Sequence, residues 1–193
     1  DGTEPGAFRA AVQPGRTMLV LAETPSNPRL ALVDLDEIGS LGGPITVVDS
    51  TFATPLGQRP LSHGVHLSLH SATKGIAGHN DATLGVVSGE KDLVDAIWGY
   101  SVLHGATPSP FDALNALRGI RTLSVRTAHQ LLHVATSLGG PETLVCHPCT
   151  TTHASLTDAE AADQGVTPGL LRVSVGLEDP TDLLADIVAA LAD

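Results

Sequence analysis

Short apolar runs separated by helical or turn-rich segments constrain the fold of this chain more than any other feature. Four of these runs have the length of a single strand, and most are followed by turn-forming or polar residues. Strands that alternate with helical and loop segments favour an α/β layer architecture with a largely parallel sheet. The sequence therefore predicts an α/β fold with a mostly parallel sheet, built on strands at Thr17–Ala22, Ile45–Asp49, Val65–His70 and Leu84–Gly89.

Helical patterns account for much of the remaining sequence. A long helix is predicted to begin at a cap on Ser109, with Pro110 in its first turn. Gly119 in its interior disfavours a helix by about 1 kcal/mol relative to alanine, and a close packing contact would explain it. A polar loop is expected before the last strand. The predicted helices cover 32–41, 92–103, 109–132 and 180–191, and the last strand covers 171–175.

The chain is acidic, with a formal net charge of −11 at pH 7 and a pI near 5.0 over 193 residues. This charge disfavours a broad electrostatic contact with nucleic acid or with an anionic membrane. No apolar run approaches the roughly 20 residues that span a bilayer, and the start of the chain lacks the pattern of a signal peptide. We therefore expect a cytoplasmic globular protein with a small-molecule substrate and with no nucleic-acid or membrane partner.

Two groups of residues have spacings that metal or redox sites use. Cys146 and Cys149 could form a redox pair or half a zinc site, but the β-branched run after them does not favour the helix that stabilises a thiolate. His66 and His70 fall on one face of a predicted strand, with His63 in the preceding turn. Scattered surface or core histidines are the preferred interpretation, and we predict no metal site.

Lys74 is one of only two lysines, and it follows Ser71 and Thr73 in an apolar neighbourhood. Asp49 ends one strand and Lys74 follows the next, so both should emerge at the same edge of a parallel sheet. The two could form a simple ion pair, and Asp49 could equally cap a helix. The same residues also suit pyridoxal 5′-phosphate (PLP), which needs an imine-forming lysine, an acid for its ring nitrogen and hydroxyls for its phosphate.

Six ordered motifs make this interpretation more specific. They are "ETPSNP" at 23–28, "VVDSTFATP" at 47–55, "HSATKGIAGHND" at 70–81, "RGIRTLSVR" at 118–126, "SLGGPETL" at 137–144 and "RVSVGLED" at 172–179. With them the sequence resembles the Cys/Met metabolism family of PLP-dependent enzymes, which includes cystathionine γ-synthase, cystathionine γ-lyase and methionine γ-lyase. The resemblance implies an aspartate aminotransferase-like fold, PLP-dependent transferase fold type I, in a shortened form.

The resemblance also implies residues that hold the cofactor. Lys74 would be the catalytic Schiff-base lysine, and Asp49 would pair with the pyridinium nitrogen of PLP. Ser71 and Thr73 would hold the phosphate. Asn27 would lie near the 3′-oxygen of the cofactor, whereas without the resemblance it would be a turn residue before a proline.

A second group of residues is implied to bind the substrate. Ser137, Leu138 and above all Arg172 would contact the substrate carboxylate. Arginine suits this role because its planar fork can hold a carboxylate in a bidentate manner. The alternative for Arg172 is a surface ion pair, which its place in an apolar strand disfavours.

The resemblance implies a partial PLP-binding large domain at 1–130, including the long helix, and a reduced small domain at 131–193. Relative to the family, the chain should lack the first part of the large domain and a further piece near Gln130. We predict a carbon–sulfur lyase that acts on cysteine, cystathionine, methionine or a related amino acid, either alone or as a domain of a larger biosynthetic enzyme. A γ-replacement enzyme and an inactive partner domain are the alternatives. A homo-oligomer or a larger assembly is expected.

Overall fold

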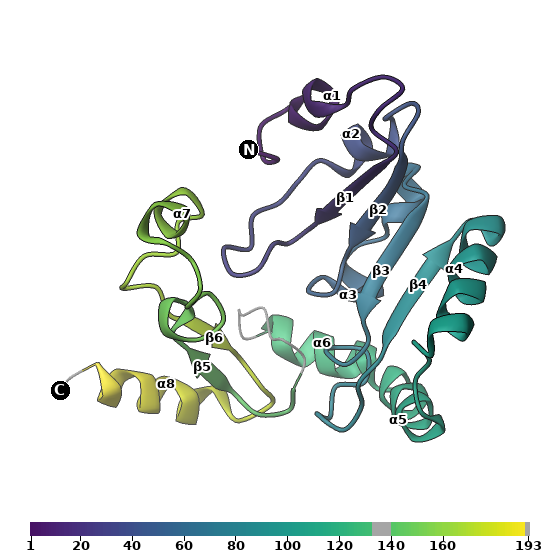
Figure 1. The fold of residues 1–193 in the computed structure, drawn as a ribbon. Coiled ribbons are helices and arrows are strands. Elements are labelled where there is room, and N and C mark those ends of the chain that lie inside the picture. The colour runs from purple at the N-terminus through teal and green to yellow at the C-terminus, as the bar shows by residue number, and fades with distance from the viewer. Residues whose placement is uncertain (133–139, 192–193) are drawn as a thin grey trace.

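The computed structural model describes residues 1–132 and 140–191, and a four-stranded sheet lies at its centre (Figure 1). The strands follow the order β1-β2-β3-β4, in which the first three are parallel and β4 runs antiparallel to β3. The predicted α/β class with a mostly parallel sheet is confirmed. The bounds of the strands are Leu19–Glu23 for β1, Ile45–Asp49 for β2, Leu67–Ser71 for β3 and Gly85–Gly89 for β4.

One face of this sheet is packed by the first two helices, α1 (Ala7–Ala11) and α2 (Leu35–Gly39). Ile38 of α2 and Val48 of β2 are fully buried at the centre of this contact. Asp34 begins α2 by accepting hydrogen bonds from the backbone of the first turn, as its position before an apolar pattern favours. The opposite face of β1 is open, because Leu19 and Leu21 are 55% and 64% exposed.

The prediction of one continuous helix from 109 to 132 is wrong, since the structure has two helices there. Ser109 does cap its start, and the Ser109 hydroxyl accepts from the backbone N–H of Asp112. The helix then ends at Ile120, and a new helix begins at Leu123 after a tight corner. The predicted contact at Gly119 is confirmed, because a Cβ there would lie 2.0 Å from the carbonyl oxygen of Ala77. The helices after β4 are α4 (Lys91–His104), α5 (Pro110–Ile120) and α6 (Leu123–Leu132).

A smaller unit lies beyond the ends of β1 and β2 and is reached from the main sheet through α6 (Figure 1). Its two strands pair antiparallel, with Cys146 opposite Arg172. The expected polar loop contains a helix, α7, which begins at a capping box formed by Thr157 and Glu160. The elements of this unit are β5 (Leu144–Cys146), α7 (Asp158–Asp163), β6 (Arg172–Ser174) and α8 (Pro180–Ala190). The remaining short elements are α3 (Thr54–Gly57) and the 3₁₀ turns η1 (Pro60–His63) and η2 (Pro148–Thr150).

Among the described helices, none is both long and apolar enough to cross a membrane.

Candidate active site

The ends of β2 and β3 meet at one edge of the sheet and carry the acid and the lysine that the sequence singles out. Asp49 is the last residue of β2, and Lys74 lies three residues beyond Ser71, the last residue of β3. Thr51 joins the two strand ends. Its hydroxyl donates to Asp49 Oδ1 at 2.5 Å and accepts from the backbone N–H of Ser71 at 2.7 Å. The structure therefore brings Asp49 and the segment that carries Lys74 to the same edge.

Asp49 does not begin a helix, so the capping alternative is not what the structure has. Its Oδ1 accepts from both the backbone N–H and the hydroxyl of Thr51, two residues later. Asp49 pairs with Glu23 on β1 and with Leu69 on β3. Because paired residues share a face and side chains alternate along a strand, Glu23, Asp49 and Ser71 lie on the same face, the one that is open over β1.

Glu23 adds a second acid to this edge. Loss of solvent around its carboxyl is the main reason that its pKa is raised above the ordinary 4.5, and the nearby Asp49 carboxylate acts in the same direction. The backbone N–H of Asn27, which donates to Glu23 Oε2 at 3.4 Å, opposes both effects. Protonation of Glu23 would lower the negative charge near Asp49.

The two hydroxyls expected to hold a phosphate differ in their surroundings. Thr73 Oγ1 accepts from the backbone N–H of Leu84 at 3.0 Å and lies 3.4 Å from the Leu84 carbonyl oxygen, so it contributes to the start of β4. The Ser71 hydroxyl makes no hydrogen bond within 1–132 and 140–191. Ser71 is therefore the hydroxyl that is freer to bind an anion.

Lys74 is half-buried, and its Nζ forms no hydrogen bond or ion pair with the residues that the structure describes. Its backbone is well held, because the Lys74 N–H donates to the Ser71 carbonyl and the Lys74 carbonyl accepts from Gly78. The simple ion pair between Asp49 and Lys74 is therefore not formed, and the amine is available to a ligand.

Asn27 and Arg172 are brought together although 145 residues separate them. Arg172 Nη1 donates to Asn27 Oδ1 at 2.8 Å. Arg172 Nε is buried and has no hydrogen-bond partner in the described part of the chain. The guanidinium is thus held through Nη1, beside the loop that follows Glu23. Ser137 and Leu138, expected beside it, lie outside the described residues.

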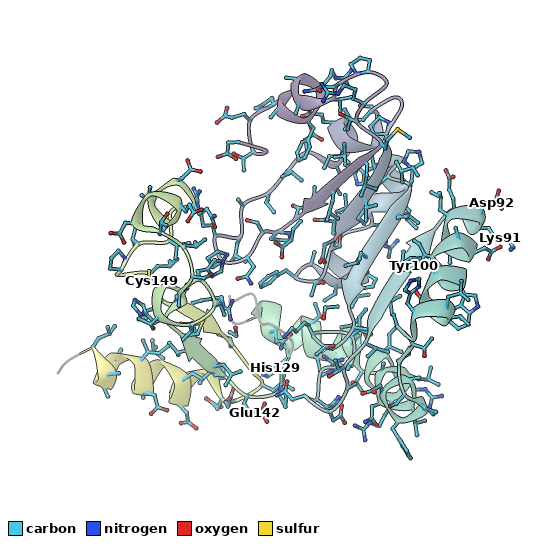
Figure 2. All side chains as sticks on the ribbon, in the orientation of Figure 1. Lys91, Asp92, Tyr100, His129, Glu142 and Cys149 are labelled. Atoms are coloured by element: carbon cyan, nitrogen blue, oxygen red, sulfur yellow. The ribbon has the colours of Figure 1, made fainter. Side chains whose placement is uncertain are left out.

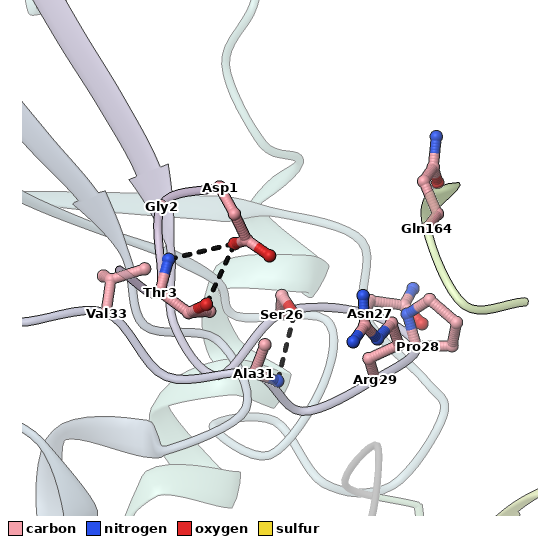
Figure 3. Close-up of a pocket in the computed structure, with 10 residues that line it drawn as sticks. All are labelled: Asp1, Gly2, Thr3, Ser26, Asn27, Pro28, Arg29, Ala31, Val33 and Gln164. Carbon is pink, nitrogen blue, oxygen red and sulfur yellow. Dashed lines mark hydrogen bonds between the residues drawn. The ribbon is translucent and has the colours of Figure 1, made fainter. Parts of the chain in front are cut away.

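A cavity of about 270 Å³ opens beside this loop (Figure 3). Asn27, Pro28 and Arg29 line one side, and Gln164 at the end of α7 lines another. Neither Asp49 nor Lys74 lines it, so it borders the candidate site at Asn27 and does not contain the lysine. The other lining residues are Asp1, Gly2, Thr3, Ser26, Ala31 and Val33.

The cysteines and histidines do not form a metal-binding group among the described residues. Cys149, labelled in Figure 2, donates its thiol proton toward the carbonyl oxygens of Val166 and Thr167, and both cysteines are free. A 3₁₀ turn follows His147, not the α-helix that a reactive cysteine pair generally uses.

His70 lies in the covered face of β3 and is 6% exposed, and its Nε2 has no hydrogen-bond partner among the residues described. Burial is the main cause that lowers the pKa of His70 from the ordinary 6.5, while the Asp49 charge acts in the opposite direction. The folded protein therefore keeps His70 neutral at a pH where the unfolded chain binds a proton.

We expect the free energy of unfolding to decrease as the pH falls below 6.5, because the unfolded state then binds more protons than the folded state. His70→Leu should flatten this dependence in urea unfolding followed between pH 7.5 and 5.5. His104→Gln, on the exposed surface of α4, is the control and should keep the wild-type slope. An unchanged slope in His70→Leu would assign the acid sensitivity to other groups.

Sequence reasoning gave no role to Thr51 or Arg126, although both contact the segment that carries Lys74. Arg126, on α6, is buried and donates to the carbonyl oxygens of Gly75 and Ile76, directly after the lysine. Both residues fall inside motifs that carry the resemblance, "VVDSTFATP" and "RGIRTLSVR". The motifs were thus the only sequence signal that could have pointed to them.

The fold and the site together define the class of protein: a fold type I PLP-dependent enzyme, with an acid and a lysine at the carboxyl ends of neighbouring strands. The family model described as "Cys/Met metabolism PLP-dependent enzyme" matches residues 1–131 and 127–192. The chain belongs to the Cys/Met metabolism family of PLP-dependent enzymes. The two matched segments meet at 127–131, where a missing piece was expected.

Curated relatives include both lyases and a synthase. The chain is 34% identical to the L-methionine γ-lyase of Pseudomonas putida, over 96% of this chain and 64% of that protein. It is also 34% identical to the cystathionine γ-synthase of Haemophilus influenzae, over 97% of this chain and 64% of that protein. The chain thus spans less than two thirds of the length of these relatives.

Solved structures agree with this assignment. A cystathionine γ-lyase from Micromonospora echinospora superposes with a TM-score of 0.90 at 31% identity, covering 100% of this chain and 68% of that one. A cystathionine γ-synthase from Xanthomonas oryzae pv. oryzae gives a TM-score of 0.89 at 33% identity, covering 100% of this chain and 67% of that one. The fold is therefore that of the lyases and synthases of this family, in a shortened form.

Proposed function

We propose that this chain is a PLP-dependent carbon–sulfur lyase that acts on a sulfur-containing amino acid such as cysteine, cystathionine or methionine. The observation that carries the proposal is the hydrogen-bond bridge through Thr51, which holds Asp49 and the Lys74 segment at one edge while the Lys74 amine has no described partner. Relatives named as methionine γ-lyase and cystathionine γ-lyase support the same reaction.

The donors at this edge fit PLP by their chemistry. Lys74 supplies an amine for the aldehyde carbon, and Asp49 a carboxylate for the ring nitrogen. Ser71 supplies a free hydroxyl for the phosphate, with Thr73 beside it. Asn27, next to the edge, would contact the 3′-oxygen. When bound, PLP draws electrons from the Cα of an amino acid.

The residues of the chain would divide the remaining work. Lys74 would move a proton between Cα and the leaving side of the substrate. Asp49 would pair with the ring nitrogen of PLP and favour its protonated form, and the two hydrogen bonds from Thr51 hold the carboxylate in place. Arg172, with Ser137 and Leu138, would bind the substrate carboxylate, and its hydrogen bond to Asn27 holds the guanidinium beside the loop after Glu23.

A γ-replacement reaction is the second candidate, because the relative from Haemophilus influenzae, a cystathionine γ-synthase, is as similar as the methionine γ-lyase. The proposal keeps the large domain at 1–130, the small domain at 131–193, the cytoplasmic location and the homo-oligomer or larger assembly that the sequence predicts. An inactive partner domain is the remaining alternative.

Two measurements test the function. With PLP, the purified protein should show a visible band that borohydride removes, and mass spectrometry should then locate the reduced cofactor on Lys74. Thiol and 2-oxo acid should be released from cystathionine or methionine without an added nucleophile. Strict dependence on cysteine together with an activated homoserine ester would replace the lyase assignment by γ-replacement. Absence of the band would favour the inactive domain.

We expect Arg172→Met to raise KM for the amino acid by roughly 10- to 150-fold, which corresponds to the loss of about 1.5–3 kcal/mol from a hydrogen bond to a charged group. Initial-rate kinetics with a fixed PLP concentration would measure this. Arg29→Met is the matched control, because Arg29 is exposed and lines the neighbouring cavity. A larger rise in KM for Arg29→Met than for Arg172→Met would move the carboxylate site into that cavity.

A further inference from the structure

Arg126 makes an unusual set of contacts for a buried arginine. It is 7% exposed, and its guanidinium donates to the carbonyl oxygens of Gly75 at 2.9 Å, Ile76 at 3.3 Å and Gly119 at 2.9 Å. Its Nε donates to Thr122 Oγ1 at 3.1 Å. All of these acceptors are neutral, and no carboxylate pairs with Arg126 in the described ranges.

Such an arrangement is energetically expensive. A buried cation loses its hydration, and burial is the cause that lowers the pKa of Arg126 below its ordinary value. Without a carboxylate, only the carbonyl oxygens compensate this loss. The planar guanidinium carries five N–H donors in a fixed fork, and Arg126 uses Nε, Nη1 and Nη2 to reach three carbonyl oxygens and one hydroxyl, which exceeds the two N–H donors of a glutamine amide or the three of a lysine ammonium. The contacts therefore account for why an arginine, and not a smaller polar residue, occupies this position.

The two carbonyls that Arg126 binds on the lysine segment belong to the residues directly after Lys74. Within the same turn, the Lys74 carbonyl already accepts from the backbone N–H of Gly78. Arg126 thus takes the next two carbonyls, those of Gly75 and Ile76, and fixes the direction in which the chain leaves Lys74.

The packing around this turn leaves no room for a side chain at two glycines. Gly78 has φ +67, and a Cβ there would lie 2.1 Å from Arg126 Nη1. A Cβ on Gly119 would lie 2.0 Å from the Ala77 carbonyl oxygen. The corner between α5 and α6 therefore touches the turn directly at two glycines, with the guanidinium between them.

We propose that Arg126 is a positioning residue for Lys74, which sets the orientation of the lysine amine by holding the backbone of the two residues that follow it. The proposal rests on the proposed role of Lys74 as the residue that binds PLP. In this role Arg126 acts on the reaction through the backbone of Gly75 and Ile76.

The two lysines of the chain provide a direct test that needs neither cofactor nor turnover. Lys91 lies on the outer helix α4, paired with Asp95, and is the internal reference (Figure 2). Reductive methylation of the PLP-free protein, quantified by mass spectrometry, gives the ratio of modification at Lys74 to that at Lys91. In Arg126→Gln we expect this ratio to rise at least about threefold, because the freed turn exposes the amine.

Kinetics supply the second measurement. In Arg126→Gln we expect kcat to fall by ~10²-fold, the effect of displacing a reacting group by about 1 Å, while KM stays within about twofold of wild type. Arg118→Gln is the matched control, because Arg118 is an exposed arginine of α5 whose ion pair with Asp81 does not involve the turn. It should leave both the ratio and kcat unchanged.

A milder variant guards against misfolding. Thr122→Val removes only the hydroxyl that Arg126 Nε uses, on an exposed residue, and should shift the ratio and kcat in the same direction by a smaller factor. A lowered melting temperature with an unchanged ratio in Arg126→Gln and Thr122→Val would make Arg126 a structural residue only and overturn the proposal. A raised ratio in a protein that forms no lysine-bound band with PLP would support the positioning contact and overturn the proposed function.

Discussion

We expect Lys74→Ala to lose at least about 10³-fold in kcat for thiol release, because it removes both the amine that binds PLP and the group that moves the substrate proton. The visible band that borohydride removes should be absent from the same variant. Both effects follow from one side chain whose amine has no partner in the described part of the chain. Absorption spectra and steady-state kinetics at saturating PLP measure them together.

Lys91→Ala is the control for this substitution. Lys91 is the only other lysine, and it is an exposed residue at the start of α4. This variant should keep the band and the wild-type kcat. Turnover that survives in Lys74→Ala, or that is abolished by Cys149→Ala, would transfer the chemistry from the lysine to the thiol.

We expect Gly119→Ala to lower the free energy of unfolding by about 1–3 kcal/mol, the typical effect of inserting atoms into a packed contact. The sign is opposite to that of helix propensity, which favours alanine over glycine in a helix by about 1 kcal/mol. The new Cβ would lie 2.0 Å from the Ala77 carbonyl oxygen, so the turn after Lys74 would have to move. Urea unfolding of the purified variants measures the change.

Gly99→Ala is the matched control, since Gly99 also lies inside a helix, α4, but a Cβ there would have no neighbouring atom within 4 Å among the described residues outside its own helix. Only the propensity effect applies there, and this variant should be more stable by about 0.5–1 kcal/mol. An increase in stability at both positions would contradict this prediction, because the corner between α5 and α6 would then accommodate the new Cβ without strain.

The strands were predictable because short, mostly apolar runs that end in turn-forming residues are typical of buried strands. The second strand was predicted at Ile45–Asp49, and β2 has the same bounds. Helix α7 was missed although its signal was present, since Thr157 and Glu160 have the spacing of a capping box. The expectation of a polar loop overlooked this local pattern.

The corner after Ile120 could not be predicted in the same way. The corner residues are Arg121 and Thr122, and neither breaks a helix as glycine or proline does. The helical pattern of the sequence continues through both. The structure turns there because Arg126 reaches back to the Gly119 carbonyl while also holding the lysine turn. A contact between segments about 50 residues apart decides this corner, and local periodicity carries no information about it.

The candidate site divides along the same line. The common edge of Asp49 and Lys74 followed from strand order and from the expected parallel sheet. Only the resemblance to a known family placed Asn27 and Arg172 in the same site. Nothing in the local sequence of either segment indicates that the two are in contact. The choice between Ser71 and Thr73 as the freer hydroxyl depends on the pairing of Thr73 with Leu84, which is a property of the folded chain.

The bond from Arg172 to Asn27 joins the last strand of the chain to the loop after the first. Closing a loop of this length is entropically unfavourable, so contacts of this kind form after the local ones. During synthesis the ribosome releases Asn27 long before Arg172 exists, and the loop must wait while the intervening segments fold. The nascent chain can therefore build its central sheet early, but Asn27 can orient the arginine only after Arg172 has been synthesised.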